Sequence, residues 1–169
     1  MAAALSGPEP LAAHHDTSGF DCGVAALNAF LVRFALTGQA SGASRTYVAV
    51  RGARVAGYYS LAAASAEPDR TAARVSKGLA RHAVPLTLLA RLAVDQREQG
   101  ARLGEALLKD AIKRHLLAQA IIGSRALVAH AKDERAAAFY ARYGFQPSPT
   151  DPLHLYLLTK DMRRTLGMR

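Results

Sequence analysis

Apolar and polar positions follow two different periods along this chain. Apolar residues recur at intervals of three and four over residues 23–36 and 100–122, which predicts two amphipathic helices, the first of them capped by Asp21. Alternating residues over 46–51 and 55–64 flank Gly52 and predict a β-hairpin. Further strands are expected at residues 11–14, 85–94, 125–131, 144–146 and 153–159, with shorter helices within residues 65–84 and after Asp133.

This order of strands and helices predicts an α/β fold in which helices flank a mixed central sheet. With 169 residues the chain has the length of one domain, so we expect a single domain over residues 1–169. Residues 1–9 and 161–169 are expected to be loose, the first because Gly7 and Pro8 interrupt it.

Charge and composition limit the classes of partner, metal site and cellular location that we expect for this domain. Lys and Arg number 22 against 13 Asp and Glu, and the formal charge of +9 favours nucleic acid over an acidic protein or an anionic membrane surface. A single cysteine, Cys22, excludes an internal disulfide, and the six histidines lack zinc-site spacing, so no metal is expected. The chain has no apolar run long enough to span a membrane and no recognisable signal peptide, which predicts a cytoplasmic location.

One segment carries the first chemical signal. The apolar run from Leu88 to Val94 leads into a loop with Gln99, Gly100 and Gly104, and then directly into the long helix. A strand, a glycine-bearing loop and a helix start in this order direct backbone N–H groups at an anion such as a cofactor phosphate. The spacing fits neither a dinucleotide-binding fingerprint nor a P-loop. The alternative is a plain strand–turn–helix connection.

A second signal lies near the C-terminus, where residues 130–145 read HAKDERAAAFYARYGF. Asp133 is placed to cap a helix, three consecutive alanines favour it, and Gly144 ends it. Tyr140 follows Phe139 on this helix. A packed aromatic pair is the simple interpretation of these two residues.

Together the two segments resemble GNAT-superfamily N-acetyltransferases, by the loop pattern [QR]-x-x-G-x-[GA] at residues 99–104 and by A-x-F-Y-x-x-x-G-F at residues 137–145. The resemblance implies the GNAT fold with a splayed central sheet, acetyl-CoA as the cofactor, and Tyr140 as the catalytic residue near its sulfur. Arg102 stands where the central loop glycine usually lies, and Glu134 replaces an asparagine of the family. The cofactor-binding residues that it implies are Leu92, Ala93, Val94, Gln99, Gly100, Ala101, Arg102, Leu103, Gly104, Glu105 and Phe139.

Further segments are similar to one GNAT branch, the TacT/AtaT-like acetyltransferase toxins of type II toxin–antitoxin modules. They are residues 20–31, 44–48, 55–61, 89–95 and 144–152 with the apolar strand that follows. This similarity implies acetylation of the α-amine of an aminoacyl-tRNA, which blocks translation. It also implies a homodimer, a ribbon-helix-helix antitoxin with a disordered tail, and an indirect contact with operator DNA through the antitoxin complex.

Elementary acid–base chemistry agrees with such an acceptor. Tyr140, with a phenolic pKa near 10, can donate a proton to the departing thiolate as general acid. An α-amine titrates near 7.7–8.0, lower still when its carboxyl is esterified, so a dedicated general base is unnecessary. A lysine side chain would need a base, and the sequence offers none in an evident position.

Basic residues at seven positions are candidates for contacts with tRNA phosphates: Arg45, Arg70, Arg74, Lys77, Arg81, Arg91 and Arg142. We single out Arg45, Lys77, Arg81 and Arg91 as the candidate tRNA-binding residues. Arg91 lies within the expected cofactor strand, where a buried charge without a partner would be costly. We therefore expect its head to reach the substrate or an acidic partner. Two other functions stay open: a GNAT enzyme that acetylates a small-molecule or protein amine, and a non-catalytic basic domain that binds nucleic acid.

Overall fold

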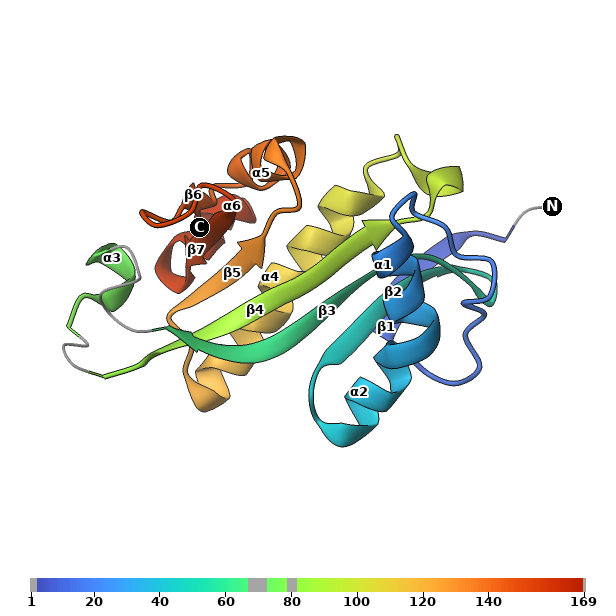
Figure 1. The fold of residues 1–169 in the computed structure, drawn as a ribbon, viewed down its shortest axis with the longest axis horizontal. Coiled ribbons are helices and arrows are strands. Elements are labelled where there is room, and N and C mark those ends of the chain that lie inside the picture. The colour runs from blue at the N-terminus through green and yellow to red at the C-terminus, as the bar shows by residue number, and fades with distance from the viewer. Residues whose placement is uncertain (1–2, 67–72, 79–81, 169) are drawn as a thin grey trace. The chain divides into compact units, whose positions relative to one another are not determined.

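The computed structural model describes residues 3–66, 73–78 and 82–168. By its packing the chain divides into two compact units: Met1–Ala62 with Ala90–Ala111, and Ala63–Leu89 with Ile112–Arg169. The long strands β3 (Arg54–Ala66) and β4 (Val84–Val94) and the helix α4 (Leu103–Ile122) each contribute residues to both units (Figure 1).

The first unit is built on the predicted hairpin. Strand β2 (Arg45–Arg51) pairs antiparallel with β3, from Arg45 opposite Leu61 to Arg51 opposite Arg54, and Gly52 at φ 65° helps to turn the chain between them. A register shift after Ala49 introduces a bulge.

Strand β1 (Leu5–Pro10) pairs antiparallel with β2, so the expected loose N-terminus and the expected strand at residues 11–14 are both wrong. Gly7 and Pro8 suggested a loop, but a register shift between Ser6 and Glu9 takes both out of the ladder. Gly7 has φ 92°, and a Cβ there would lie 2.8 Å from the carbonyl oxygen of Val48, so the strand requires glycine.

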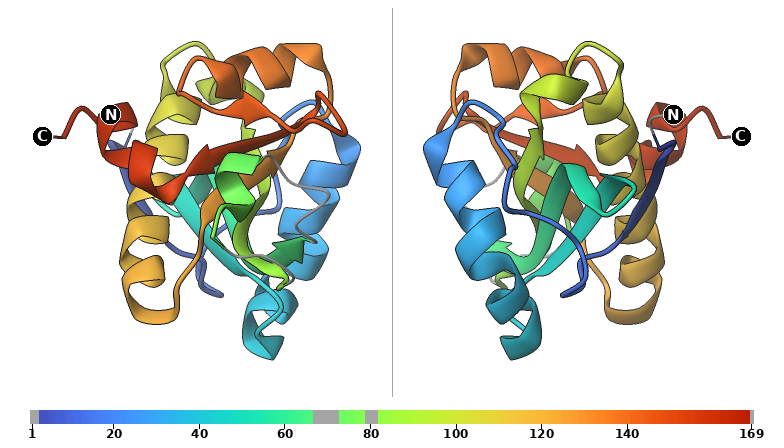
Figure 2. Two further views of the ribbon diagram at one scale, coloured as in Figure 1. Left: turned by 90° about the vertical axis from the view of Figure 1, so that its left-hand side faces the viewer. Right: turned by 90° about the vertical axis from the view of Figure 1, so that its right-hand side faces the viewer.

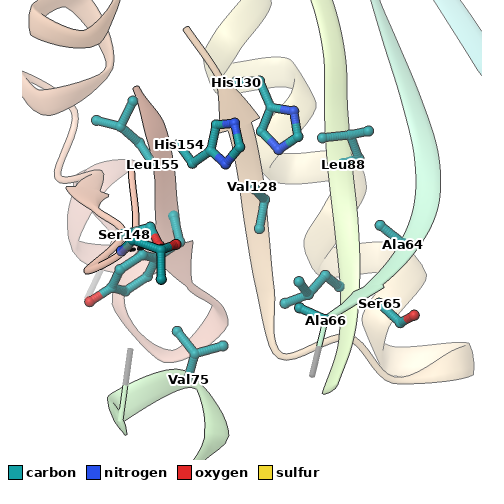
Figure 3. A pocket seen from close by; sticks show the side chains of 13 residues that line it. Ala64, Ser65, Ala66, Val75, Leu88, Val128, His130, Ser148, His154 and Leu155 are labelled. Atoms are coloured by element: carbon teal, nitrogen blue, oxygen red, sulfur yellow. Dashed lines mark hydrogen bonds between the residues drawn. The ribbon is translucent and has the colours of Figure 1, made fainter. Parts of the chain in front are cut away.

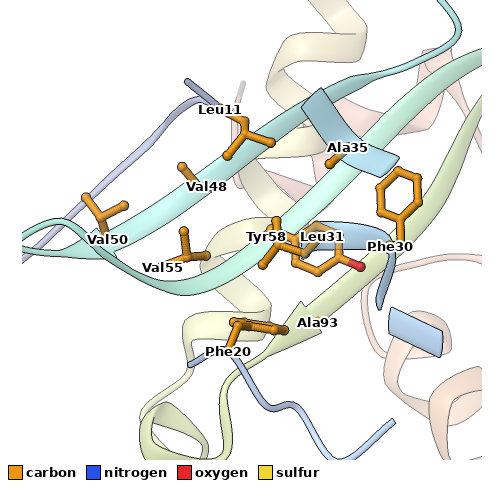
Figure 4. Packing of buried hydrophobic residues seen from close by; sticks show 10 residues of the cluster. All are labelled: Leu11, Phe20, Phe30, Leu31, Ala35, Val48, Val50, Val55, Tyr58 and Ala93. Atoms are coloured by element: carbon orange, nitrogen blue, oxygen red, sulfur yellow. The ribbon is translucent and has the colours of Figure 1, made fainter. Parts of the chain in front are cut away.

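The predicted helix over residues 23–36 is a longer helical run of three parts: α1 (Ala25–Ala29), the π-helical turn η1 (Phe30–Phe34) and α2 (Ala35–Ser41), which ends at Gly42. It covers one face of the hairpin and buries a hydrophobic core there (Figure 4). Tyr58 lies at the centre of this core, with its ring 5.6 Å from that of Phe20 and 6.1 Å from that of Phe30. Its hydroxyl donates to the carbonyl of Leu27 at 2.8 Å, which satisfies the buried polar group.

The first half of α4 covers the opposite face of the hairpin (Figure 2). Tyr59, the neighbour of Tyr58 on β3, donates its hydroxyl to Asp110 of α4 at 2.5 Å. Gly57 lets the helix approach closely, because a Cβ there would meet Leu107 at 2.9 Å and Leu103 at 3.2 Å. Successive residues of β3 thus face different helices, as the period of a strand requires.

The second unit contains the parallel pair of the sheet. Strand β4 pairs with β5 (Ala126–His130) over Thr87–Leu89 and continues to Val94. Strand β7 (His154–Leu158) is antiparallel to β5 and to β6 (Gln146–Pro147), so the expectation of a mixed sheet is confirmed.

Short helices complete the second unit: α3 (Ala73–Ser76), α5 (Glu134–Ala141), the 3-10 turn η4 (Thr159–Asp161) and α6 (Met162–Thr165). Met162 is fully buried, so the chain after residue 160 is not simply loose as we expected. A core of Val75, Val84, Leu86, Ala126, Tyr156 and Leu158 holds α3 to the strands. No helix in the described part of the chain is both long and apolar enough to cross a membrane.

We expect Gly57→Ala to destabilise the protein by about 1–3 kcal/mol, because the added methyl would overpack the contact between β3 and α4. Gly19→Ala is the matched control, since a Cβ there would have Arg97 as a neighbour at 3.9 Å, an ordinary contact. Urea unfolding of both variants measures the effect. A Gly57→Ala midpoint equal to that of the control would show that the helix is not held this closely.

Candidate functional site

The loop before α4 presents a row of unused backbone donors. The first hydrogen bond of the helix runs from the amide of Ala106 to the carbonyl of Arg102. Among the described residues, no acceptor is within hydrogen-bond reach of the amides of Gly100 to Gly104. Five consecutive free N–H groups at the positive end of a 20-residue helix are donors of the kind that suit an anion. These free amides have the arrangement that the sequence predicts for the loop, and cofactor binding by them stays a prediction.

Arg102 takes the glycine-like conformation of this loop despite its side chain. Its φ is 64°, and among the described residues it is the sole non-glycine with a positive φ. Gly100 has φ 88° and open space around it. A left-handed arginine costs on the order of 1 kcal/mol. The Arg102 side chain is exposed and has no carboxylate partner among the described residues, so it adds a free positive charge to the loop.

A buried carboxylate fixes the start of this loop. Asp95 is 1% exposed and directly follows β4. It accepts hydrogen bonds from the Arg97 backbone at 2.9 Å and side chain at 2.9 and 3.0 Å, and from the Asp21 amide at 3.2 Å. The Arg97 guanidinium in first place, with the backbone amides, lowers the pKa of Asp95 to about 2. The carboxylate is therefore ionised at neutral pH.

Two further polar contacts hold the turn that follows. Glu98, in η3 (Gln96–Glu98), accepts from Arg51 at 2.9 and 3.0 Å and from Arg54 at 2.6 Å, which ties the turn to the tip of the hairpin. These two arginines lower the pKa of Glu98 to about 2. Gln99 donates its side-chain amide to the carbonyl of Val94 at 3.0 Å. Its side chain thus shapes the loop, while the donors of the next residues stay open.

The other predicted cofactor residues of the first unit fall into two groups. The side chains of Ala93 and Leu103 are buried in the protein interior, so only their backbone groups are available to a ligand. Leu92 and Val94 on β4 are half-buried, and Glu105 pairs with Lys109 at 3.0 Å.

Tyr140 and Phe139 belong to the second unit, on α5. The Asp133 side chain caps this helix by accepting from the amide of Ala136 at 2.8 Å, as predicted. The ring of Tyr140 packs against those of Phe139 and Phe145 at 5.3 and 5.4 Å. Its hydroxyl has no hydrogen-bond partner among the described residues, and burial raises its pKa to about 12. The structure thus holds a neutral phenol in one orientation with its proton uncommitted.

The second unit also contains a pocket of about 390 Å³ beside β4 and β5 (Figure 3). Its lining is mainly apolar, with Leu86, Leu88 and Val128 among its residues. His130 and His154 lie side by side over it, with ring centroids 3.9 Å apart. Burial and the neighbouring imidazole lower the pKa of His130, so this ring is neutral at pH 7. The described residues contain no cluster of His, Cys, Asp or Glu that would hold a metal ion.

The basic residues singled out from the sequence are found in both units. The Arg91 guanidinium lies 3.7 Å from the centre of the Phe30 ring, a cation–π contact, and no carboxylate pairs with it within the described residues. Arg45 is exposed at the start of β2 in the first unit. Lys77 is exposed in the second unit, and Arg81 lies outside the described residues.

Sequence reasoning missed the side chains that support the site. Asp95 and Arg97 are two residues apart, a spacing typical of an aspartate that caps a turn, and this signal was available. The partners of Glu98 are 44 and 47 residues away, so nothing local indicates them. The same holds for the pairing of His130 with His154 across two strands.

Comparison with known proteins agrees with this geometry. Residues 42–147 match the family model described as an acetyltransferase (GNAT) domain. A tRNA-acetylating toxin of Mycobacterium tuberculosis (strain ATCC 25618 / H37Rv) is 43% identical over 162 residues, 96% of this chain and 97% of that protein.

Two solved structures have a closely similar fold. One is AtaT complexed with acetyl-methionyl-tRNAfMet, with a TM-score of 0.85, 28% identity, and coverage of 96% of this chain and 98% of that one. The other is a tyrosine-to-phenylalanine mutant of the AtaT toxin bound to the C-terminus of the antitoxin AtaR and acetyl-CoA. Its TM-score is 0.82 at 28% identity, with coverage of 98% of this chain and 99% of that one.

We expect Asp95→Asn to change how stability depends on pH. The folded pKa of Asp95, about 2, lies below the ordinary value of 3.8. The ionised group therefore adds about 2 kcal/mol of stability above pH 4, which is lost as pH falls through about 2. The variant should be less stable at pH 7 and lose less stability on acidification, as measured by urea unfolding between pH 2 and pH 7. Parallel curves for the two proteins would contradict the assignment.

We expect Arg102→Gly to stabilise the fold by up to about 1 kcal/mol, because the left-handed backbone is no longer strained. The same change should weaken acetyl-CoA binding by about three- to fivefold, since one charge near the phosphates is lost. Arg102→Lys is the matched control: it keeps both charge and strain, and should bind as the wild type does. Thermal unfolding and calorimetric titration measure the two effects. Undiminished affinity in Arg102→Gly would remove the side chain from the binding site.

Proposed function

Because the chain belongs to the GNAT acetyltransferase family, we propose that it is an acetyl-CoA-dependent N-acetyltransferase acting as a toxin on aminoacyl-tRNA. It transfers the acetyl group to the α-amine of the amino acid and thereby blocks translation. The observation that carries this proposal is the 43% identity to a tRNA-acetylating toxin over nearly the whole of both chains. The described geometry supports the chemistry at two places, the loop before α4 and the phenol of Tyr140.

The loop is suited to the pyrophosphate of acetyl-CoA. The free amides of Gly100 to Gly104 are donors without acceptors, and the Arg102 side chain adds positive charge beside them. The backbone of Leu92 to Val94, at the end of β4, is the natural partner for the amides of the pantetheine arm. Bound acetyl-CoA supplies the thioester from which the acetyl group comes.

Tyr140 supplies the proton in this proposal. Its pKa of about 12 keeps the proton on Oη throughout the physiological range, and no protein acceptor among the described residues competes for it. Donation to the departing sulfur avoids the release of a free thiolate. Phe139 and Phe145 pack against the ring and fix the direction of the hydroxyl.

The acceptor needs little help to become a nucleophile. The α-amine of an aminoacyl ester titrates below about 7.7, so much of it is neutral at cellular pH without a base. An acceptor with an unperturbed lysine pKa near 10.4 would be almost fully protonated. This difference favours an α-amine over a protein side chain as the substrate.

The partners follow from the same family membership. A related toxin, AtaT, has been solved with the C-terminus of its antitoxin, AtaR, and we propose an antitoxin for this chain as well. We further propose that this antitoxin is of the ribbon-helix-helix type and that the complex contacts operator DNA through it. The toxin itself is proposed to be a homodimer located in the cytoplasm.

The decisive experiment incubates the protein with labelled acetyl-CoA and total charged tRNA, and identifies acetylated aminoacyl adenosine by mass spectrometry. Tyr140→Phe should lower kcat by a factor of about 10²–10⁴. Stability should change by less than about 0.5 kcal/mol, because the hydroxyl has no protein partner among the described residues.

The matched control is Tyr143→Phe, which removes a hydroxyl from a neighbouring ring that packs on Phe139 at 5.3 Å. It should retain wild-type turnover. Full activity in Tyr140→Phe would refute the role of the phenol, and a wild type that leaves every aminoacyl-tRNA unlabelled would refute the function.

A further inference from the structure

A basic hollow of about 390 Å³ lies in the second unit, and its described lining includes no residue of the loop before α4 and none of α5. Four cationic side chains from separate parts of the chain line it: Arg74 of α3, Lys77 just after it, Arg125 before β5, and Lys160 of η4. Among the described residues of its lining, Leu158 is the one with an apolar side chain. Four cations around one hollow repel one another, so their convergence favours an anionic ligand.

Two of these cations also build the hollow. Arg125 donates to the carbonyl of Val75 at 3.0 Å and to that of Lys77, which holds the α3 turn against the start of β5. Arg74 pairs with Asp161 at 2.9 Å and donates to Gln146 at 3.2 Å. The two guanidinium groups are therefore fixed in place. Asp161 offsets the charge of Arg74, whereas Arg125 has no carboxylate partner among the described residues.

The other two cations are uncommitted. Lys77 and Lys160 are exposed, and neither has an ion-pair partner among the described residues. Arg163 and Arg164 follow Lys160 within one helical turn and are exposed as well. Positive charge thus continues from the hollow along α6, in a strip instead of a single point.

The neutral polar groups of the hollow are already engaged. The Thr159 hydroxyl donates to the carbonyl of Ser124 at 2.8 Å and lies 2.9 Å from the ring nitrogen of His115. The groups available to a ligand are therefore mainly the N–H donors of the lysine and arginine side chains. This chemistry suits phosphate oxygens, which accept and do not donate.

We propose that this hollow and the adjoining α6 strip bind the phosphate backbone of the tRNA substrate, an inference that rests on the proposed function. A peptide that folds on binding gains most of its affinity from buried apolar or aromatic anchors, and one leucine offers little to such a ligand. Repeated phosphates along a strand match a strip of cations without any apolar contact. In this proposal the aminoacyl end of the tRNA reaches the acetyl-transfer site while the hollow and α6 hold the phosphate backbone of the tRNA body.

The test uses charge reversal in the full-length protein, with Lys77→Glu and Lys160→Glu made singly and together. Lys113→Glu is the matched control, an exposed lysine on α4 with no partner among the described residues and outside both proposed sites. Binding of deacylated tRNA is measured without acetyl-CoA over a series of salt concentrations. Each reversal at the hollow should weaken binding about fivefold or more at 0.15 M salt and lower the salt slope by about one. The control should follow the wild type.

Turnover separates this inference from the function on which it rests. The hollow variants should raise KM for charged tRNA and leave kcat and KM for acetyl-CoA unchanged. Wild-type tRNA affinity in the double variant would overturn the proposal, and so would loss of binding to an acidic antitoxin peptide with tRNA binding intact. If tRNA is bound through these lysines but never acetylated, the binding surface stands and the proposed function fails.

Discussion

The buried carboxylate of Asp95 is the constraint on which the rest of the site depends. It lies where β4 ends, and it gathers the amide of Asp21 from 74 residues earlier and both the amide and the guanidinium of Arg97. A charge that is 1% exposed must be compensated, so these donors are obligatory. Satisfying them sets the direction in which the chain leaves the strand, and therefore where residues 100–104 present their amides. The anion site is in this sense a product of one desolvated charge.

The supporting contacts are made by side chains, which leaves the backbone of the loop unused. Glu98 is held by Arg51 and Arg54, and Gln99 turns its side chain back to β4. None of these bonds consumes an amide of residues 100–104. A loop fixed by its own backbone hydrogen bonds would have no donors left for a phosphate. The side-chain contacts around the loop also explain the backbone of Arg102, because they hold it in a strained conformation that the residue alone would avoid.

Local signals made the helices, the hairpin and the loop predictable from the sequence. Asp133 caps α5 and Gly144 ends the turn after it, because capping and left-handed backbone depend on neighbours in sequence. Prediction failed where distant residues decide. Strand β1 forms despite Gly7 and Pro8 because β2 is beside it. The side chains that support the loop could not be predicted for the same reason, since they come from four separate segments of the chain.

The wide turn η1 shifts the angular phase of its helix, because a π turn holds more residues than an α turn. Phe30 and Ala35 consequently lie inside, whereas Val32, Phe34 and Leu36 are between 43% and 58% exposed. The helix geometry that places Phe30 against the Arg91 guanidinium therefore exposes the three apolar side chains to solvent. Exposed apolar surface promotes aggregation, and the formal charge of +9 opposes aggregation through electrostatic repulsion between molecules. At high salt, where that repulsion is screened, this exposed apolar surface favours self-association.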